Sequence, residues 1–117
     1  EIKGKSVVII DDSIVRGTTS KRLVKILRDS GAREIHFRSV SPPIIAPCFL
    51  GIDTPKKDDL IAANMTVEEL KDYLGVDSLE FLSVENLINI LGSDQHCFGC
   101  FTEKYPVAKP KESELFN

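Results

Sequence analysis

The sequence predicts an α/β fold built on a doubly wound parallel sheet. Three observations favour this class: a continuous apolar run at 7–10, an amphipathic helical pattern at 21–32 and an alternating strand pattern at 34–40. Strand, helix and strand over roughly thirty residues form a βαβ unit, whose crossover is right-handed in nearly all known cases. A strand without polar residues is typical of a parallel sheet that is covered on both faces.

The predicted βαβ unit has clear boundaries. The first strand consists of β-branched residues and stops at Asp11 and Asp12. Gly31 lies where the C-terminus of the helix favours a left-handed residue. In the second strand, Ile35 and Phe37 alternate with polar neighbours, which is the period of a strand. The apolar positions of the helix are Leu23, Val24, Ile26 and Leu27.

Two further helices carry boundary signals at both ends. Each follows a hydroxyl residue that can cap it, and each is closed by a glycine. A short strand is predicted between them. These segments are a helix at 66–74 opened by Thr66 and closed by Gly75, a strand at 78–83, and a helix at 84–91 capped by Ser83 and closed by Gly92.

Two segments are expected to be irregular. Residues 41–55 form a long connection that is broken by prolines, and a helical stretch at 57–64 follows it. Residues 93–106 form a loop that carries two of the three cysteines. We divide the chain into one domain portion at 1–101 and a polar tail at 102–117.

Composition excludes several classes of protein. The chain has 117 residues, 42% of them hydrophobic, and a formal net charge of −3, which argues against a general nucleic-acid binder. No apolar run approaches the roughly 20 residues of a membrane span. The polar opening does not resemble a secretory leader, and it lacks Met, so we expect a processed product or an excised piece. An odd number of cysteines does not suit a disulfide framework, so the expected location is the cytoplasm.

The loop after the first strand is the candidate binding site. Ligands of open parallel sheets collect beyond the carboxyl ends of the strands, where Asp11 and Asp12 lie. Gly17 allows close approach of the backbone, and the helix start offers free N–H groups to a phosphate. The adjacent acids suit sugar hydroxyls or Mg²⁺, which usually takes one or two carboxylates. The expected ligand is a phosphorylated sugar with a vicinal diol, with hydroxyl donors from Thr18, Thr19 and Ser20.

Two other interpretations of this loop stay open. Asp, Ser, Thr and Gly can stand between a strand and a helix simply to turn the chain and cap the helix. Alternatively, Asp11 or Asp12 could be a phospho-acceptor, as in haloacid-dehalogenase-like or receiver domains. Those domains do not need the Gly-Thr-Thr-Ser segment that follows here.

The stretch VVIIDDSIVRGTTS, residues 7–20, resembles the phosphoribosyl-pyrophosphate (PRPP) loop of type I phosphoribosyltransferases. In particular it is similar to the amidophosphoribosyltransferase family, which replaces the pyrophosphate of PRPP with glutamine-derived ammonia to give phosphoribosylamine. The likeness runs to about residue 106 through SPPIIAPCFLGIDTP, DDLIAAN, TVEELKDYLGVDSLEFLSVENL and CFGCFTEKYP. In that family, the replacement of the pyrophosphate of PRPP with ammonia is the first committed step of purine synthesis.

The resemblance implies a role for each residue of the loop. Asp11 and Asp12 would hold the ribose 2- and 3-hydroxyls and take part in Mg²⁺ binding. Arg16 could add positive charge, or it could be a solvent-facing turn residue. The segment expected to enclose the 5-phosphate comprises Ser13, Ile14, Val15, Arg16, Gly17, Thr18, Thr19 and Ser20.

The cysteines allow several interpretations. Cys97 and Cys100 form a CxxC pair, which is open to zinc, iron–sulfur or redox chemistry, and three reduced thiols remain an ordinary alternative. His96 could complete a Cys₃His zinc site or lie at the surface as a loop residue. The resemblance implies that Cys48, Cys97 and Cys100 are three of the four ligands of a [4Fe–4S] cluster, with the fourth outside this chain.

The resemblance also implies that part of the enzyme is missing from this chain. The glutaminase domain of the family and the front of its transferase domain have no counterpart here, so the chain is expected to be the C-terminal portion and inactive alone. The implied partners are PRPP, ammonia, purine nucleotides as inhibitors and, for the whole protein, further copies of itself. A non-catalytic nucleotide-binding domain of the same fold is the alternative.

Overall fold

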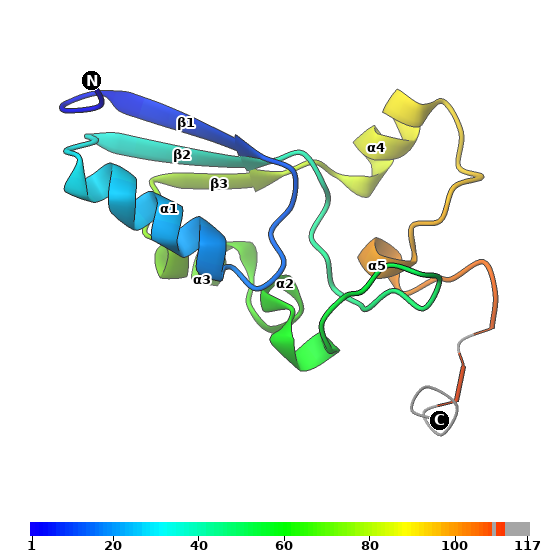
Figure 1. The fold of residues 1–117 in the computed structure, drawn as a ribbon. Helices are drawn as coiled ribbons and strands as arrows, with labels where there is room; N and C mark the ends of the chain where they lie inside the picture. The colour runs from blue at the N-terminus through cyan, green and yellow to red at the C-terminus, as the bar shows by residue number, and fades with distance from the viewer. Residues whose placement is uncertain (109, 112–117) are drawn as a thin grey trace.

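The computed structural model describes residues 1–108, 110 and 111. Its centre is a sheet of three parallel strands in the order β1-β2-β3, comprising β1 (Ser6–Asp11), β2 (Glu34–Ser39) and β3 (Ser78–Phe81) (Figure 1). The register pairs Ile9 with Phe37 and Phe37 with Leu79. The predicted α/β class and parallel sheet are therefore confirmed. Of the predicted tail at 102–117, residues 109 and 112–117 lie outside the described residues.

One face of the sheet is covered by the two crossover helices, α1 (Thr18–Asp29) and α3 (Val67–Leu74) (Figure 1). Each helix contributes its apolar stripe to a core shared with the strands, as the helical periodicity predicts. Strands that follow in the order 1-2-3 with both helices on one face have crossovers of the same hand. The buried core comprises Ile9, Ile14, Val24, Ala32, Ile35, Phe37, Ile61, Leu70, Leu74, Val76 and Leu79.

The prediction that the first strand is buried on both faces is wrong for the part of the chain that the structure describes. Ile9 points into the core, but Val8 is 60% exposed and Ile10 is 72% exposed. Side chains alternate between the faces of a strand, and α1 and α3 both pack on the Ile9 face. The apolar run therefore shows that the residues suit a strand but does not show which face is covered.

The predicted caps of the later helices are confirmed. Thr66 accepts the N–H of Glu69 at 3.2 Å, and Ser83 accepts that of Asn86 at 3.0 Å at the start of α4 (Val84–Leu91). Gly75 and Gly92 adopt left-handed conformations with φ of 76° and 68°. Because the helix begins with the cap at residue 83, the predicted strand 78–83 ends earlier, at Phe81.

The predicted helical stretch at 57–64 is divided. A 3₁₀ turn η1 (Lys57–Asp59) precedes α2 (Ile61–Asn64), and Leu60 between them is extended, with φ −82° and ψ 109°. The side chain of Asn64 bridges the break by donating to the carbonyls of residues 57, 58 and 60. A short helix α5 (Gly99–Thr102) forms inside the predicted cysteine loop, and the first long helix begins at Thr18 rather than at 21.

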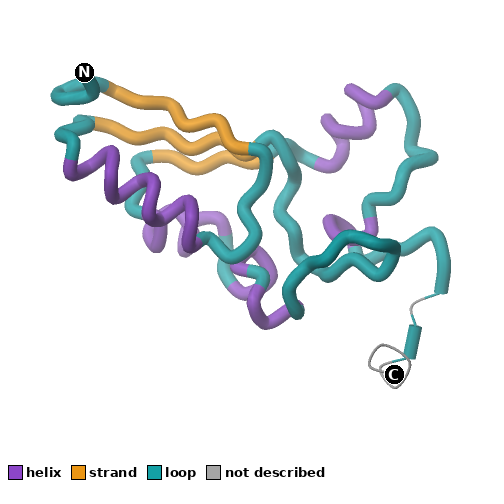
Figure 2. The backbone as a smooth tube through the Cα atoms, in the orientation of Figure 1, coloured by secondary structure: helices purple, strands orange, loops and turns teal. Residues whose placement is uncertain are grey.

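Two irregular segments, 41–56 and 93–108, lie beyond the carboxyl ends of the strands (Figures 1 and 2). They are joined by backbone bonds from Ile45 and Ala46 to the carbonyl of Cys100, at 2.9 and 3.1 Å. The hydroxyl of Tyr105 donates to the carbonyl of Pro47 at 2.6 Å. We call these joined segments the cysteine lobe. Among the described residues, no helix has the length and apolar character that crossing a membrane requires.

Candidate functional site

A pocket of about 520 Å³ opens at the carboxyl end of β1. Its first wall is the predicted binding loop. Ile14 belongs to this loop but does not line the pocket: its side chain is 1% exposed and lies in the core, so it supports the loop from beneath. The residues of the loop that line the pocket are Asp11, Asp12, Ser13, Val15, Arg16, Gly17, Thr18, Thr19 and Ser20.

The two acids stand at the mouth of the loop. Asp11 is the last residue of β1, and its Oδ1 accepts the backbone N–H of Asp12 at 2.9 Å. Asp12 is exposed and its Oδ1 accepts the hydroxyl of Ser13 at 3.4 Å. These bonds leave further lone pairs on both carboxylates, which can accept sugar hydroxyls or bind a hard cation.

Gly17 turns the loop into α1. It adopts a left-handed conformation with φ 79°, and its carbonyl accepts the N–H of Lys21, which begins the helix. The N-cap residue Gly17 has no side chain that could accept a hydrogen bond, and the first turn contains no acid. The N–H groups of Thr18, Thr19 and Ser20 also have no acceptor within the helix, because the first N–H groups of any helix lack one. Such a helix start attracts an anion through its N–H groups and its dipole.

The second wall of the pocket is formed by Asp53, Thr54 and Pro55, which sequence reasoning did not assign to the site. They come from the proline-rich connection, forty residues along the chain from the loop. Their signal in the sequence was weak: an acid and a hydroxyl residue before a proline. The hydroxyl of Thr54 accepts the backbone N–H of Cys48 at 2.7 Å, which ties this wall to the cysteine-bearing part of the lobe.

The charges at the pocket are mixed. The lining includes three acidic residues, Asp11, Asp12 and Asp53, and one basic residue, Arg16, which is exposed. Within the described part of the chain, no group of three or more His, Cys, Asp or Glu residues is placed to hold a metal ion by itself. Mg²⁺ usually takes only one or two protein carboxylates together with ligand oxygens and water, and Asp11 and Asp12 are the residues that could provide them here.

The three cysteines are free thiols in the cysteine lobe. Cys48 and Cys100 are half-buried and Cys97 is exposed. Burial raises the pKa of the Cys100 thiol, and the neighbouring Cys48 and Cys97 raise it further by charge repulsion. The absence of a metal-holding group of three or more His, Cys, Asp or Glu side chains among the described residues applies to these thiols as well. His96 is exposed, and its ring lies edge-on to that of Phe98 with centroids 6.4 Å apart.

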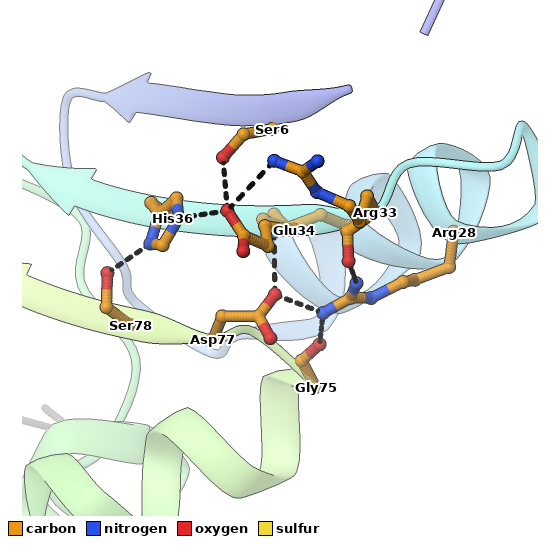
Figure 3. A network of polar contacts seen from close by, with 9 residues as sticks. Ser6, Arg28, Arg33, Glu34, His36, Gly75, Asp77 and Ser78 are labelled. Atoms are coloured by element: carbon orange, nitrogen blue, oxygen red, sulfur yellow. Dashed lines mark hydrogen bonds and ion pairs between the residues drawn. The ribbon is translucent and has the colours of Figure 1, made fainter. Parts of the chain in front are cut away.

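A polar network braces the opposite end of the sheet (Figure 3). Asp77 accepts the backbone N–H of Ile35 at 2.7 Å and the guanidinium of Arg28 at 2.6 Å, and both contacts lower the pKa of its carboxyl. Glu34 accepts the hydroxyl of Ser6 at 2.8 Å, which lowers the pKa of Glu34. His36, which the sequence places on a strand, joins β2 to β3 through Ser78 at 2.8 Å.

The fold and the pocket define an α/β domain with a parallel sheet and a polar pocket at the carboxyl end of its first strand. No family model matches the chain. Amidophosphoribosyltransferase 2, chloroplastic, of Arabidopsis thaliana is 53% identical to it, and the match covers 97% of this chain and 20% of that protein. The amidophosphoribosyltransferase of Archaeoglobus fulgidus is 50% identical, with 95% of this chain and 25% of that protein covered.

A solved structure gives the same result. The glutamine PRPP amidotransferase from B. subtilis, complexed with ADP and GMP, superposes with a TM-score of 0.87 at 49% identity, over 95% of this chain and 26% of that one. The resemblance found in the sequence is therefore confirmed: the chain is related to amidophosphoribosyltransferases over almost its whole length. It spans about a fifth to a quarter of the length of these relatives.

Proposed function

We propose that the pocket binds the ribose 5-phosphate part of PRPP, and that the chain supplies this site to an amidophosphoribosyltransferase. The observation that carries the proposal is the loop itself, which brings two carboxylates and an uncapped helix start to one pocket. Asp11 and Asp12 hold the ribose diol and take part in Mg²⁺ binding. Residues 13–20 enclose the 5-phosphate, with Gly17, Thr18 and Thr19 closest to it.

The proposed reaction replaces the pyrophosphate of PRPP with glutamine-derived ammonia, as the first committed step of purine synthesis. Its transition state has oxocarbenium character, so the protein contributes mainly by fixing the reacting groups and stabilising charge. The loop meets the first need because Ile14 is buried beneath it and Val15 accepts the N–H of Ile61 at 3.0 Å. Mg²⁺, when bound, supplies positive charge near the departing pyrophosphate.

Purine nucleotides are proposed as inhibitory ligands of the whole protein. A ribonucleoside 5-monophosphate has the same phosphate and ribose diol as PRPP, so it satisfies the same loop. The B. subtilis relative is described in complex with ADP and GMP, which supports this proposal. A second similar structure is described as the allosteric regulatory enzyme of purine biosynthesis, with a TM-score of 0.86.

The direct test is an amide NMR titration of the chain with ribose 5-phosphate and Mg²⁺. We expect shifts confined to residues 11–20 and 53–55, and a loss of these shifts in the double variant Asp11→Asn/Asp12→Asn. The matched control Asp58→Asn/Asp59→Asn removes two adjacent acids outside the pocket lining and should bind as the wild type does. A folded chain without shifts at the loop would refute the proposal.

We also propose that the chain alone does not make phosphoribosylamine. The relatives are four to five times its length, from the covered shares of 25% and 20%, and the whole activity is attributed to those longer proteins. The test incubates the chain with PRPP, Mg²⁺ and ammonia and follows the release of pyrophosphate. Product formation above the uncatalysed rate would contradict the proposal.

The cysteine lobe is proposed to carry three ligands of a [4Fe–4S] cluster, namely Cys48, Cys97 and Cys100. The location of all three cysteines in the two joined segments of the cysteine lobe supports this set. Each cysteine of such a cluster binds a different iron, so the thiols need not converge on one point as they must for a single zinc ion. The carbonyl of Cys100 already accepts the backbone N–H groups of Ile45 and Ala46, so a cluster would be structural and would further join 93–108 to 41–56.

The cluster proposal is tested by reconstitution with iron and sulfide. Because the fourth ligand lies outside this chain, we expect iron incorporation that is incomplete and lost on gel filtration. A Cys48→Ser variant should incorporate less still, whereas His96→Ala should behave as the wild type does. A loss of iron incorporation in His96→Ala equal to that in Cys48→Ser would contradict a ligand set made of the three cysteines alone.

We propose a homo-oligomer in a reducing compartment for the whole protein. Free thiols are typical of the cytoplasm. The Arabidopsis thaliana relatives are named chloroplastic, so we expect the compartment to depend on the organism from which the chain comes. Light scattering of the full-length protein gives its oligomeric state directly.

A further inference from the structure

We propose that Thr54 is a positioning residue that sets the second wall of the pocket, residues 53–55, against the binding loop by anchoring it to Cys48 within the cysteine lobe. The ligand named in this inference rests on the proposed function, but the anchoring itself is a property of the free chain. Thr54 lines the pocket and accepts the backbone N–H of Cys48 at 2.7 Å. One side chain therefore belongs to both the pocket and the lobe.

The Cys48 end of this contact is firmly held. The nearby Ala46 donates its N–H to the carbonyl of Cys100. The carbonyl of Pro47 accepts the hydroxyl of Tyr105. The ring of Phe49 packs edge-on against that of Tyr105, with centroids 5.2 Å apart. Tyr105 also lies directly against Gly99, where a side chain would not fit. Residues 46–49 are therefore fixed to the C-terminal part of the lobe by polar and aromatic contacts.

The segment between the two residues is less restrained. Gly51 has φ 120° with open space around it, and Leu50 and Ile52 are 48% and 71% exposed. Because the tip of this turn is exposed, its packing does little to place the wall. The Cys48–Thr54 bond closes the turn at its base, and it transfers the rigidity of residues 46–49 to the pocket.

The other end of the wall leads back to the binding loop. Lys57, two residues after Pro55, forms an ion pair with Glu103 of the lobe. Ile61 donates its N–H to Val15 of the loop at 3.0 Å. The two walls are thus joined on one side through α2, whereas on the other side the second wall depends on Thr54. A displacement of residues 46–49 is therefore expected to reach the pocket through the Thr54 hydroxyl, whereas a displacement of residues 93–108 can also reach it through the Lys57–Glu103 ion pair.

The test compares Thr54→Val, which keeps the shape and removes the acceptor, with Thr54→Ser, which keeps the hydroxyl. In the ligand-free chain, amide exchange of Cys48 should accelerate by about three- to tenfold in the valine variant, as expected for the loss of one hydrogen bond. Affinity for ribose 5-phosphate with Mg²⁺ should fall by a similar factor of about three to ten. The serine variant should restore both quantities.

The matched control is Ser83→Ala, which also removes a hydroxyl that accepts one backbone N–H, but on α4 and outside the pocket lining. It should leave both quantities unchanged. Unaltered Cys48 exchange in Thr54→Val would overturn the inference, and so would a wild-type affinity in that variant. Absence of ribose 5-phosphate binding by the wild type would refute the proposed function instead, and the exchange rates would still decide the anchoring.

Discussion

Gly17 lies directly against the side chain of Ile61: a Cβ atom at Gly17 would stand 2.7 Å from Cδ1 of Ile61. The backbone of Ile61 meanwhile donates to Val15, two residues before this glycine. The first wall of the pocket is thus held from below by α2. The contact explains why the turn into α1 needs a residue without a side chain, in addition to its left-handed φ of 79°.

The first prediction concerns this contact. Gly17→Ala should lower the free energy of unfolding by about 1–2 kcal/mol, because L-residues are strained in the left-handed region. Gly75→Ala is the matched control, since Gly75 has nearly the same φ, 76°, and open space around it. Both variants should lose similar stability in urea, but only Gly17→Ala should weaken ribose 5-phosphate binding. Equal binding by the two variants would show that Ile61 yields without moving the loop.

The second prediction concerns acid stability. Hydrogen bonds from Ile35 and Arg28 lower the pKa of Asp77 below its ordinary 3.8, and Ser6 does the same for Glu34, whose ordinary value is 4.5. A carboxyl with a lowered folded pKa stabilises the protein above its unfolded pKa, and this contribution is lost as pH falls through the folded value. The free energy of unfolding, measured by urea denaturation, should therefore decrease as the pH falls below about 4.

The same network gives a variant test. Asp77→Asn should cost about 1 kcal/mol at pH 7, because a part-exposed charged hydrogen bond to Arg28 is weakened. The variant should also show a smaller decrease in stability between pH 5 and about pH 3 than the wild type, since one titrating group has been removed. An unchanged pH dependence would mean that Asp77 is not linked to folding.

The third prediction concerns thiol reactivity. The thiolate is the reactive form, and burial raises the pKa of Cys100, so less thiolate is present at neutral pH. Cys97 is exposed. With limiting iodoacetamide under reducing, metal-free conditions, mass spectrometry should find Cys97 alkylated before Cys100. The unfolded chain in urea is the control and should show similar rates at both residues.

The fourth prediction contrasts two helix caps. Thr66→Ala should lower global stability by about 1 kcal/mol, because α3 buries Leu70 and Leu74 in the core. Ser83→Ala removes an equivalent cap from α4, none of whose residues is buried in the described structure. It should reduce the helical circular-dichroism signal without shifting the main urea transition. A shift of equal size in both variants would show that α4 unfolds together with the core.

Much of the fold could be predicted from local signals. The caps at Thr66 and Ser83 act on amides three residues away, and Gly75 and Gly92 close their own helices, so short sequence windows suffice. The first wall of the pocket is also local, because a strand end, a turn and a helix start follow one another in the chain. For the same reason the sequence predicts the loop at 11–20 as the candidate binding site, and this loop lines the pocket.

Tertiary structure decided the features that depend on distant residues. The second wall reaches the pocket because Thr54 is bonded to Cys48 and α2 is bonded to Val15, and no short window contains both pairs. The sequence did not indicate which face of β1 is exposed either, because a strand of β-branched residues is equally apolar on both faces. Val8 and Ile10 are exposed and Ile9 is buried because α1 and α3 both pack on the Ile9 face. The sequence by itself determined the strands, the caps and the loop, because these are set by nearest neighbours. The covered face and the completed pocket came from packing between segments far apart in the chain.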